Sequence, residues 1–325
     1  MSEKIIVNNI EALNNALDIA LSKDKSVVLY GEDAGFEGGV FRATKGLQQK
    51  HGAERVWDAP IAENAIMGSA IGASYVGLKP VVEIQFSGFS YLIMQQLFCH
   101  AARIRHRTRG QLNAPLVVRM PMGGGIKALE HHSESLEAIY AHIPGVKVVM
   151  PCTPYDTKGL MLAAINDPDP VIFFEPKKIY RAFKQEIPAG EYIVEIGKAN
   201  VLTQGSKLTI VTYGSNVIDT LEIVKQYPAG DIELIDLRTI KPLDWATVLG
   251  SVQKTGRLLV VHEAVKSFSL SAEIITRVNE KLFSSLKKAP MRVTGFDITV
   301  PLAKGEAIQF DLKQRTIDAI NELLA

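Results

Sequence analysis

The sequence predicts an α/β fold in which a parallel-sheet domain is followed by a smaller α/β domain. Short apolar runs such as residues 27–30 and 171–174 alternate with segments that have helical spacing. Apolar runs separated by helices are typical of parallel strands that are covered on both faces. A length of 325 residues also suits two domains, since a domain commonly has about 150 residues.

The first domain is expected to span residues 1–180. Its first helix is indicated by four apolar residues at helical spacing, which are Ile10, Leu13, Leu17 and Leu21. The elements expected after this helix are a strand at 27–30, a small-residue helix at 64–76, a strand at 80–86, a helix through 99–107, strands at 116–119 and 146–150, a helix from Pro154 and a strand at 171–174. This order favours one parallel sheet with helices on both faces.

A linker is expected at residues 181–205, where the periodicity lapses and Pro188, Gly190 and Gly197 interrupt a charged stretch. The second domain is then expected to span residues 206–325. Its expected elements are strands at 208–213, 232–237, 258–262 and 291–294, with helices between them and a closing helix at 312–324. It is therefore interpreted as a smaller α/β unit.

Composition excludes several classes of partner. Lys and Arg number 36 against 35 Asp and Glu, a net charge of +1, so no overall field attracts nucleic acid or an anionic membrane. Cys99 and Cys152 are too few for a disulfide framework. The sequence has neither a signal-peptide core nor an apolar run of about 18 residues. We expect a cytoplasmic protein, or a mature organellar form whose targeting segment is missing.

Common catalytic motifs are absent from the sequence. It has no GxSxG elbow, no HExxH pair and no Walker loop. Gly123-Gly124-Gly125 followed by Ala128 loosely matches a dinucleotide fingerprint, but Pro121 intervenes and no acidic residue ends the next strand. The three glycines are better explained by a turn that needs backbone freedom.

Polar and glycine-containing segments follow several of the predicted strands. They are Gly31-Glu32-Asp33, residues 38–44, residues 58–63, residues 83–89, Gly123-Gly124-Gly125 and His131-His132-Ser133. Open parallel sheets bind ligands at the carboxyl ends of their strands. These segments are therefore expected to converge on one crevice.

The order and spacing of these segments resemble the beta chain of the decarboxylating component of 2-oxo acid dehydrogenase complexes, most of all its pyruvate members. The resemblance covers nearly the whole chain. It includes the downstream runs at residues 144–149, 154–160, 236–240 and 254–257. It implies a thiamine-diphosphate-binding parallel-sheet domain followed by a transketolase C-terminal-like domain.

The resemblance also implies partners. It implies an α2β2 heterotetramer that is active only with an alpha subunit, and a dihydrolipoyl acyltransferase core whose lipoyl domain accepts the acetyl group. Thiamine diphosphate would lie between the chains. Thiamine enzymes usually hold magnesium with Gly-Asp-Gly and a later Asn, and no Gly-Asp-Gly occurs here. Magnesium is therefore expected in the alpha subunit.

Family position gives roles to three residues on the cofactor. Glu63 matches the glutamate that shares a proton with the aminopyrimidine ring, although an acid in a first helical turn also suits the helix dipole. Phe89 matches the aromatic that stacks on this ring, with a core aromatic as the alternative. Gln85 is expected as a further cofactor contact, and Phe86 is expected in the core.

His132 matches the family histidine near the reacting end of the cofactor, where an imidazole can move protons during decarboxylation or acyl transfer. The neighbouring His131 matches no family histidine and is interpreted as a loop residue. Glu63 and His132 are thus the predicted catalytic residues.

A potassium site is a further implication of the resemblance. Residues 164–169 match the loop that the family orders with potassium, so Ala164 and Leu116 are candidate ligands together with the side chain of Asp167. Asp169 stands where an amide is common. The alternative is an ordinary turn that ends a helix before Pro170.

Three other readings of the function stay open. The chain resembles branched-chain members at residues 173–176 and pyruvate members at residues 39–46 and 132–137. A branched-chain 2-oxo acid or acetoin dehydrogenase beta subunit is therefore an alternative. A non-catalytic assembly subunit is another, although Glu63, Phe89 and His132 are all retained.

Overall fold

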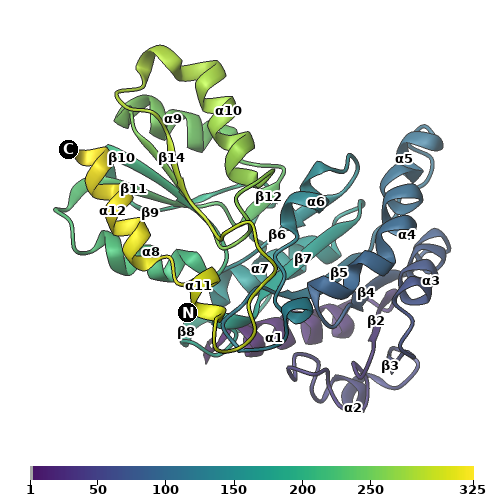
Figure 1. Cartoon of the computed structure of the whole chain (residues 1–325). Coiled ribbons are helices and arrows are strands. Elements are labelled where there is room, and N and C mark those ends of the chain that lie inside the picture. Colours follow the sequence, from purple (N-terminus) through teal and green to yellow (C-terminus); the bar gives the residue numbers. More distant parts are fainter. Residues whose placement is uncertain (1–2) are drawn as a thin grey trace.

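A seven-stranded and a five-stranded sheet form the framework of the computed structural model, which describes residues 3–325 (Figure 1). The larger sheet has the order β12 (Thr239–Lys241), β6 (Lys147–Val149), β7 (Val171–Pro176), β5 (Val117–Met122), β4 (Lys79–Glu83), β2 (Val27–Gly31) and β3 (Val56–Asp58). All its neighbours are parallel except β12, which is antiparallel to β6. The predicted parallel sheet is confirmed.

Helices cover both faces of this sheet. α1 (Asn9–Lys23) and α7 (Pro154–Ile165) pack together on one face and bury leucines and alanines against it. α3 (Glu63–Tyr75), α4 (Met94–Cys99) and α6 (Glu137–His142) cover the other face. A sheet covered on both faces explains why its strands read as continuous apolar runs.

Local capping fixes where the helices of the first face begin. The Asn8 side chain accepts a hydrogen bond from the Glu11 amide, and the Glu11 carboxylate accepts one from the Asn8 amide, both at 2.9 Å. At α7, Thr153 caps the Asp156 amide and Pro154 occupies the first turn. Such caps satisfy amides that have no partner within the helix.

The smaller sheet has the order β14 (Met291–Val293), β13 (Leu258–Val261), β10 (Gly205–Thr212), β11 (Gly230–Asp236) and β9 (Asn200–Thr203). Only β9 is antiparallel to its neighbour. The helices on one face are α8 (Asn216–Val224) and α12 (Lys313–Leu324), and those on the other are α9 (Trp245–Thr255) and α10 (Leu270–Leu282). The remaining strands and α-helices are β1 (Lys4–Val7) paired with β8 (Gln185–Pro188), α2 (Leu47–His51), α5 (Ile104–Arg107) and α11 (Glu306–Phe310).

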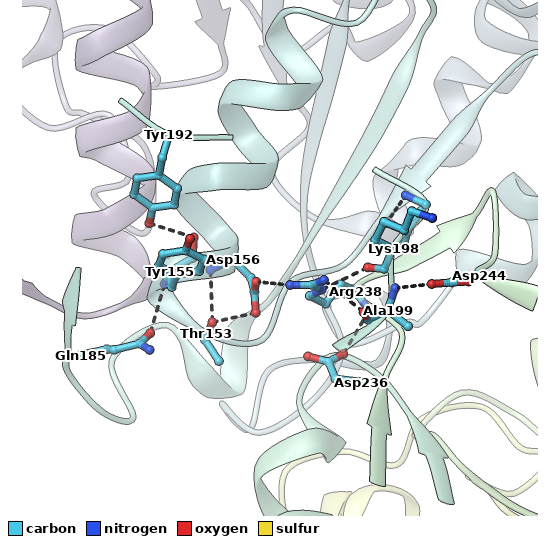
Figure 2. Close-up of polar contacts among 12 residues, drawn as sticks. Thr153, Tyr155, Asp156, Gln185, Tyr192, Lys198, Ala199, Asp236, Arg238 and Asp244 are labelled. Atoms are coloured by element: carbon cyan, nitrogen blue, oxygen red, sulfur yellow. Dashed lines mark hydrogen bonds and ion pairs between the residues drawn. The ribbon is translucent and has the colours of Figure 1, made fainter. Parts of the chain in front are cut away.

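A network of hydrogen bonds and one ion pair links the parts of the chain that contain the two sheets (Figure 2). These two parts also share an apolar core. Arg238 pairs with Asp156 of α7 at 2.9 Å and donates to the carbonyls of Lys198 and Ala199 at 3.1 and 3.2 Å. The Ala199 amide in turn donates to Asp244 at 3.1 Å. Residues 198–199, which precede β9, and residues after β11 are thereby tied to the first sheet.

The structure differs from the expected elements in a few places. The strand expected at 80–86 ends at Glu83, because the chain turns into a 3-10 segment, η1 (Ser87–Ile93). The helix expected through 99–107 is broken at His100, whose ψ of −71° departs from the helical value, so α4 and α5 are separate.

The division into 1–180, 181–205 and 206–325 stays a prediction, and residues 1–2 lie outside the described part. Two strands, β8 and β9, lie within the range expected as a linker. β12 lies in the range of the second predicted domain but pairs with β6 of the larger sheet. Within residues 3–325, no helix is both long and apolar enough to cross a bilayer.

Candidate active site

The candidate site lies where the parallel strands of the larger sheet end. The register pairs Gly31 with Glu83, the last residues of β2 and β4, so the carboxyl ends of these two strands are level, and Glu83 is paired with Arg119 of β5, which continues to Met122. The segments that follow them carry the residues predicted for the site. The expected convergence at one edge of the sheet agrees with this register.

Phe86, Phe89 and His132 form one aromatic cluster. The ring centres of Phe86 and Phe89 are 5.3 Å apart, and that of His132 lies 4.5 Å from Phe86 and 5.1 Å from Phe89, all edge to face. Phe89 belongs to η1 after β4, whereas His132 ends η3 (Glu130–His132) after β5. Phe86, expected in the core, is buried but is also a wall of this cluster.

The His132 imidazole has an unused polar atom. Its Nδ1 is buried and has no hydrogen-bond partner among the described residues. Burial first, then the nearby His131 and Lys177, lower the pKa of His132 below its ordinary value, so the neutral imidazole predominates at pH 7. A neutral ring with a free nitrogen can accept a proton from a bound molecule.

Gln85 lies at the base of the site, where its side chain is buried. Its amide nitrogen lies 3.4 Å from both the Glu32 carbonyl oxygen and an Asp33 carboxylate oxygen. These long contacts connect the end of β4 with the loop after β2. Gln85 is therefore oriented by the chain itself and keeps its amide oxygen for another partner.

Glu63 is the first residue of α3, and only 7% of its surface is exposed. Burial, then the charges of the Asp33 and Glu63 carboxylates, raise the pKa of Glu32, so the carboxyl groups of Glu32 and Glu63 are near enough to interact. The structure thus groups Glu63 and Gln85 with the loop of Glu32. Sequence reasoning flagged Gly31-Glu32-Asp33 as a segment but gave Glu32 no role; its position directly after a strand is the signal that could have found it.

His131 is a second residue that sequence reasoning set aside. Its ring lies 5.5 Å from that of Phe89 and is stacked at 6.1 Å on that of Tyr91. Its carbonyl oxygen would lie 1.9 Å from a Cβ atom at position 88, so only glycine fits there. His131 therefore packs against the Phe89 segment. No sequence signal distinguished it, because these contacts join distant parts of the chain.

A buried ion cluster lies under the site. Arg119 pairs with Glu83 at 2.7 Å and with both oxygens of Glu175 at 2.7 and 3.0 Å, and all three side chains are buried. The Tyr180 hydroxyl also donates to Glu175 at 2.6 Å. Paired in this way, the buried charges link three neighbouring strands, β4, β5 and β7.

The oxygen atoms predicted to bind potassium already accept hydrogen bonds from other groups of the chain. Both carboxylate oxygens of Asp167 accept from the Lys147 ammonium, at 2.6 and 2.7 Å. The Ala164 carbonyl accepts the Asp167 amide at 3.2 Å, and the Leu116 carbonyl accepts the Val171 amide at 3.0 Å. An ammonium group already neutralises Asp167, so this donor set does not fit a free cation as the side chains stand.

Large apolar side chains are exposed in the segments that carry the site residues. Ile61 lies two residues before Glu63, and Tyr91 and Leu92 share η1 with Phe89. Leu129 immediately precedes η3, and Phe36 lies in the loop after β2. The exposed fractions of Ile61 and Phe36 are 78% and 72%. Apolar residues gathered in this way are typical of a surface that another chain covers.

Comparisons with known proteins agree with this arrangement. The model of "Transketolase, pyrimidine binding domain" matches residues 7–182, and that of "Transketolase, C-terminal domain" matches residues 197–313. The chain is 69% identical, over 99% of both chains, to pyruvate dehydrogenase E1 component subunit beta of Mycoplasma genitalium. It is 65% identical, over 100% of both chains, to the protein of the same name from Mycoplasma pneumoniae. A solved split-gene transketolase, an inactive beta4 tetramer, matches 98% of both chains with a TM-score of 0.75 at 20% identity, which bears on the fold alone.

Proposed function

Because the chain belongs to the family of pyruvate dehydrogenase E1 component beta subunits, we propose that it serves in the oxidative decarboxylation of pyruvate with reductive acetylation of lipoyl groups. The enzyme would depend on thiamine diphosphate and would be active only with an alpha subunit. The observation that carries this proposal is the buried Glu63 at the same sheet edge as Gln85, Phe89 and His132.

The residues present suit thiamine diphosphate. The buried carboxyl group of Glu63 in α3 can share a proton, and the ring of Phe89 in η1, which packs against α3, offers a stacking surface. The buried Nδ1 of His132, which has no partner within residues 3–325, supplies an unused polar atom. When bound, the cofactor supplies a weakly acidic thiazolium carbon that becomes the nucleophile, together with an aminopyrimidine ring.

Each residue then has a distinct task. The Glu63 carboxyl would share a proton with a ring nitrogen of the aminopyrimidine, and Phe89 would hold that ring by offset packing. Gln85 would orient the ring through its amide. His132, kept neutral, would accept or return a proton near the reacting carbon.

The alpha subunit would complete the site. We propose that it holds the diphosphate through magnesium, because this sequence has no Gly-Asp-Gly. The exposed apolar side chains of Phe36, Ile61 and Leu129 near the site support such a cover. An α2β2 assembly, a dihydrolipoyl acyltransferase core and its lipoyl domain belong to the same proposal.

Potassium and location complete the proposal. Potassium at Asp167, Ala164 and Leu116 would require Lys147 to release the Asp167 carboxylate, so we assign it no part in the chemistry. A cytoplasmic location is supported by the bacterial relatives and by Cys99 and Cys152, which are both free thiols.

The branched-chain alternative gains nothing from the structure. Phe173 and Phe174, which resemble branched-chain members, are fully buried in β7 and do not line the candidate site. Pyruvate, which the names of the relatives print, is the proposed substrate.

The test is reconstitution with the alpha chain. Reduction of dichlorophenolindophenol is measured for the isolated chain and for the assembled pair, with pyruvate and with 3-methyl-2-oxobutanoate. We expect no turnover by the isolated chain and faster turnover of pyruvate by the pair. Tight magnesium-dependent cofactor binding and turnover by the isolated chain, or a preference for the branched acid, would contradict the proposal.

A further inference from the structure

Lys177 is buried directly beneath the candidate site. It follows β7, and only 3% of its surface is exposed. Its ammonium donates to the carbonyl of Gly123 at 2.6 Å and to the carbonyl of His132 at 2.7 Å. It also lies 5.5 Å from the centre of the Phe86 ring. One cation thereby joins both ends of the loop 123–132, which ends at the site histidine.

Residues from the part of the chain that contains the smaller sheet also contact this loop. The Glu306 carboxylate in α11 accepts from the amides of Gly125 and Lys127, at 2.8 and 3.0 Å. Glu263, which follows β13, accepts from the Ser135 hydroxyl at 3.1 Å. Glu306 therefore binds the loop itself, while Glu263 binds Ser135 just after the loop and lies against Gly123 at its start.

Little space is left for this loop to move. A Cβ atom at Gly123 would lie 1.9 Å from a Glu263 carboxylate oxygen, and one at Gly124 would lie 2.2 Å from the Phe310 ring. Gly123 and Gly125 have φ values of +75° and +95°, which other residues rarely adopt. The three glycines are thus explained by close packing, in agreement with the turn that the sequence favoured.

The charge of Lys177 is set by its surroundings. Burial lowers its pKa to about 7, against the opposing effect of the Glu263 and Glu306 carboxylates. The positive charge of Lys177 is in turn one of the causes that lower the pKa of His132. A lysine is rarely buried without a partner, because desolvating an ammonium is costly. The partners of the Lys177 ammonium are the carbonyls of Gly123 and His132, at the two ends of the loop 123–132.

We infer that Lys177 is a positioning residue: together with Glu263 and Glu306 it holds the loop 123–132 so that the His132 imidazole faces Phe86 and Phe89. The inference rests on the proposed role of His132. Glu263 and Glu306, which belong to the part of the chain with the smaller sheet, thereby help to position a residue of the candidate site. The groups that face Lys177 are Glu263, Glu306 and His132, from three different segments.

The test uses the enzyme assembled with its alpha chain and the variant Lys177→Met. We expect kcat for pyruvate to fall at least tenfold, while KM and the affinity for thiamine diphosphate change less than about threefold, since His132 is displaced without losing the cofactor groups. The acidic limb of the pH profile should move to higher pH, because removal of a neighbouring cation raises the pKa of His132. Lys184→Met, at an exposed lysine, is the control and should behave as the parent.

A second variant, Glu306→Gln, weakens the contacts of the same loop while the side chains of Lys177 and His132 are both retained, and it is the deciding variant if Lys177→Met fails to assemble. We expect it to lower kcat about threefold or more. Parental kcat and pH profile in Lys177→Met, or in Glu306→Gln when it is the deciding variant, would overturn the inference. His132→Ala separates the two levels: parental activity in that variant refutes the proposed role of His132 itself, whereas a loss of activity there with full activity in Lys177→Met refutes only the positioning role.

Discussion

Asp236 shows how strongly the junction of the two sheets perturbs a single residue (Figure 2). Its carboxyl group is fully buried, and one oxygen accepts from the Arg238 amide at 3.0 Å while the other has no partner among the described residues. Burial, and then the charge of Asp156, raise its pKa to about 8. The folded chain therefore keeps a proton that the unfolded chain has released above about pH 4.

A pH dependence of stability follows from this shift. Because folding raises the pKa of Asp236, the contribution of this group to the free energy of unfolding is fully present below about pH 4. It is lost as the pH rises through about 8. We expect Asp236→Asn, which cannot ionise, to gain thermal stability relative to the parent between pH 5 and 8.5, by a few degrees. Melting temperatures across this range measure it, with the exposed Glu280→Gln as control. A parent-to-variant difference that is independent of pH would contradict the assignment.

The roles of the candidate site residues were predicted from the family resemblance and stay predictions, whereas strand order predicted only that their segments meet at one edge of the sheet. Glu63, Gln85 and Phe89 follow parallel strands, and the structure brings their segments to one edge with His132. His131 lay in one of these segments but was given no role, and Lys177 was not singled out. Their importance comes from contacts between distant segments, such as the Lys177 ammonium on the carbonyl of Gly123, which periodicity does not encode.

At the scale of elements, Gly88 allows η1 and η3 to approach each other closely. A Cβ atom at Gly88 would lie 1.9 Å from the His131 carbonyl oxygen and 3.0 Å from the carbonyl carbon, both backbone atoms that cannot rotate away. The segment that carries Phe89 and the segment that carries His132 therefore meet at this point. Any side chain larger than hydrogen must separate them.

We expect Gly88→Ala to lower turnover of the assembled enzyme at least tenfold, because it separates Phe89 from His132, and to cost about 1–3 kcal/mol of stability. Gly72→Ala, within α3 where a Cβ atom meets nothing within 4 Å, is the matched control. It should keep full activity and be as stable as the parent or slightly more so. Turnover and melting temperature of both variants are measured, and parental turnover in Gly88→Ala would refute the close contact.

Most long elements could be predicted, whereas short edge strands could not. α1 and the strands β2, β7 and β13 lie close to their predicted ranges, because each has a clear apolar pattern or cap. β9 and β12 have four and three residues and form only by pairing with distant strands. Such pairing depends on tertiary contacts rather than on local propensity.

At the scale of the whole molecule, the isolated chain exposes several large apolar side chains. Exposed Ile61 and Phe36 near the candidate site, and Phe268 with 96% of its surface exposed, are costly to leave in water. Phe268 also has a positive φ of 55°, a backbone conformation that residues other than glycine rarely adopt. These surfaces agree with a subunit that works in an assembly.

The arrangement of the two units relative to each other was not predictable from the sequence. The Arg238–Asp156 pair and the contacts of Glu306 with Gly125 join residues 82 and 181 positions apart. Such pairs carry no local pattern, so the sequence indicated two domains but not that the second helps to hold the histidine loop of the first.

The central claim is that the Glu63 carboxyl shares a proton with the bound cofactor, and Glu63→Gln in the reconstituted heterotetramer tests it most directly. This variant keeps the size of the side chain and one acceptor oxygen. We predict that the enzyme still assembles and binds thiamine diphosphate, but that turnover of pyruvate falls about 100-fold or more, while Glu280→Gln is unaffected. Turnover equal to that of the parent enzyme would contradict the account and favour a non-catalytic assembly subunit.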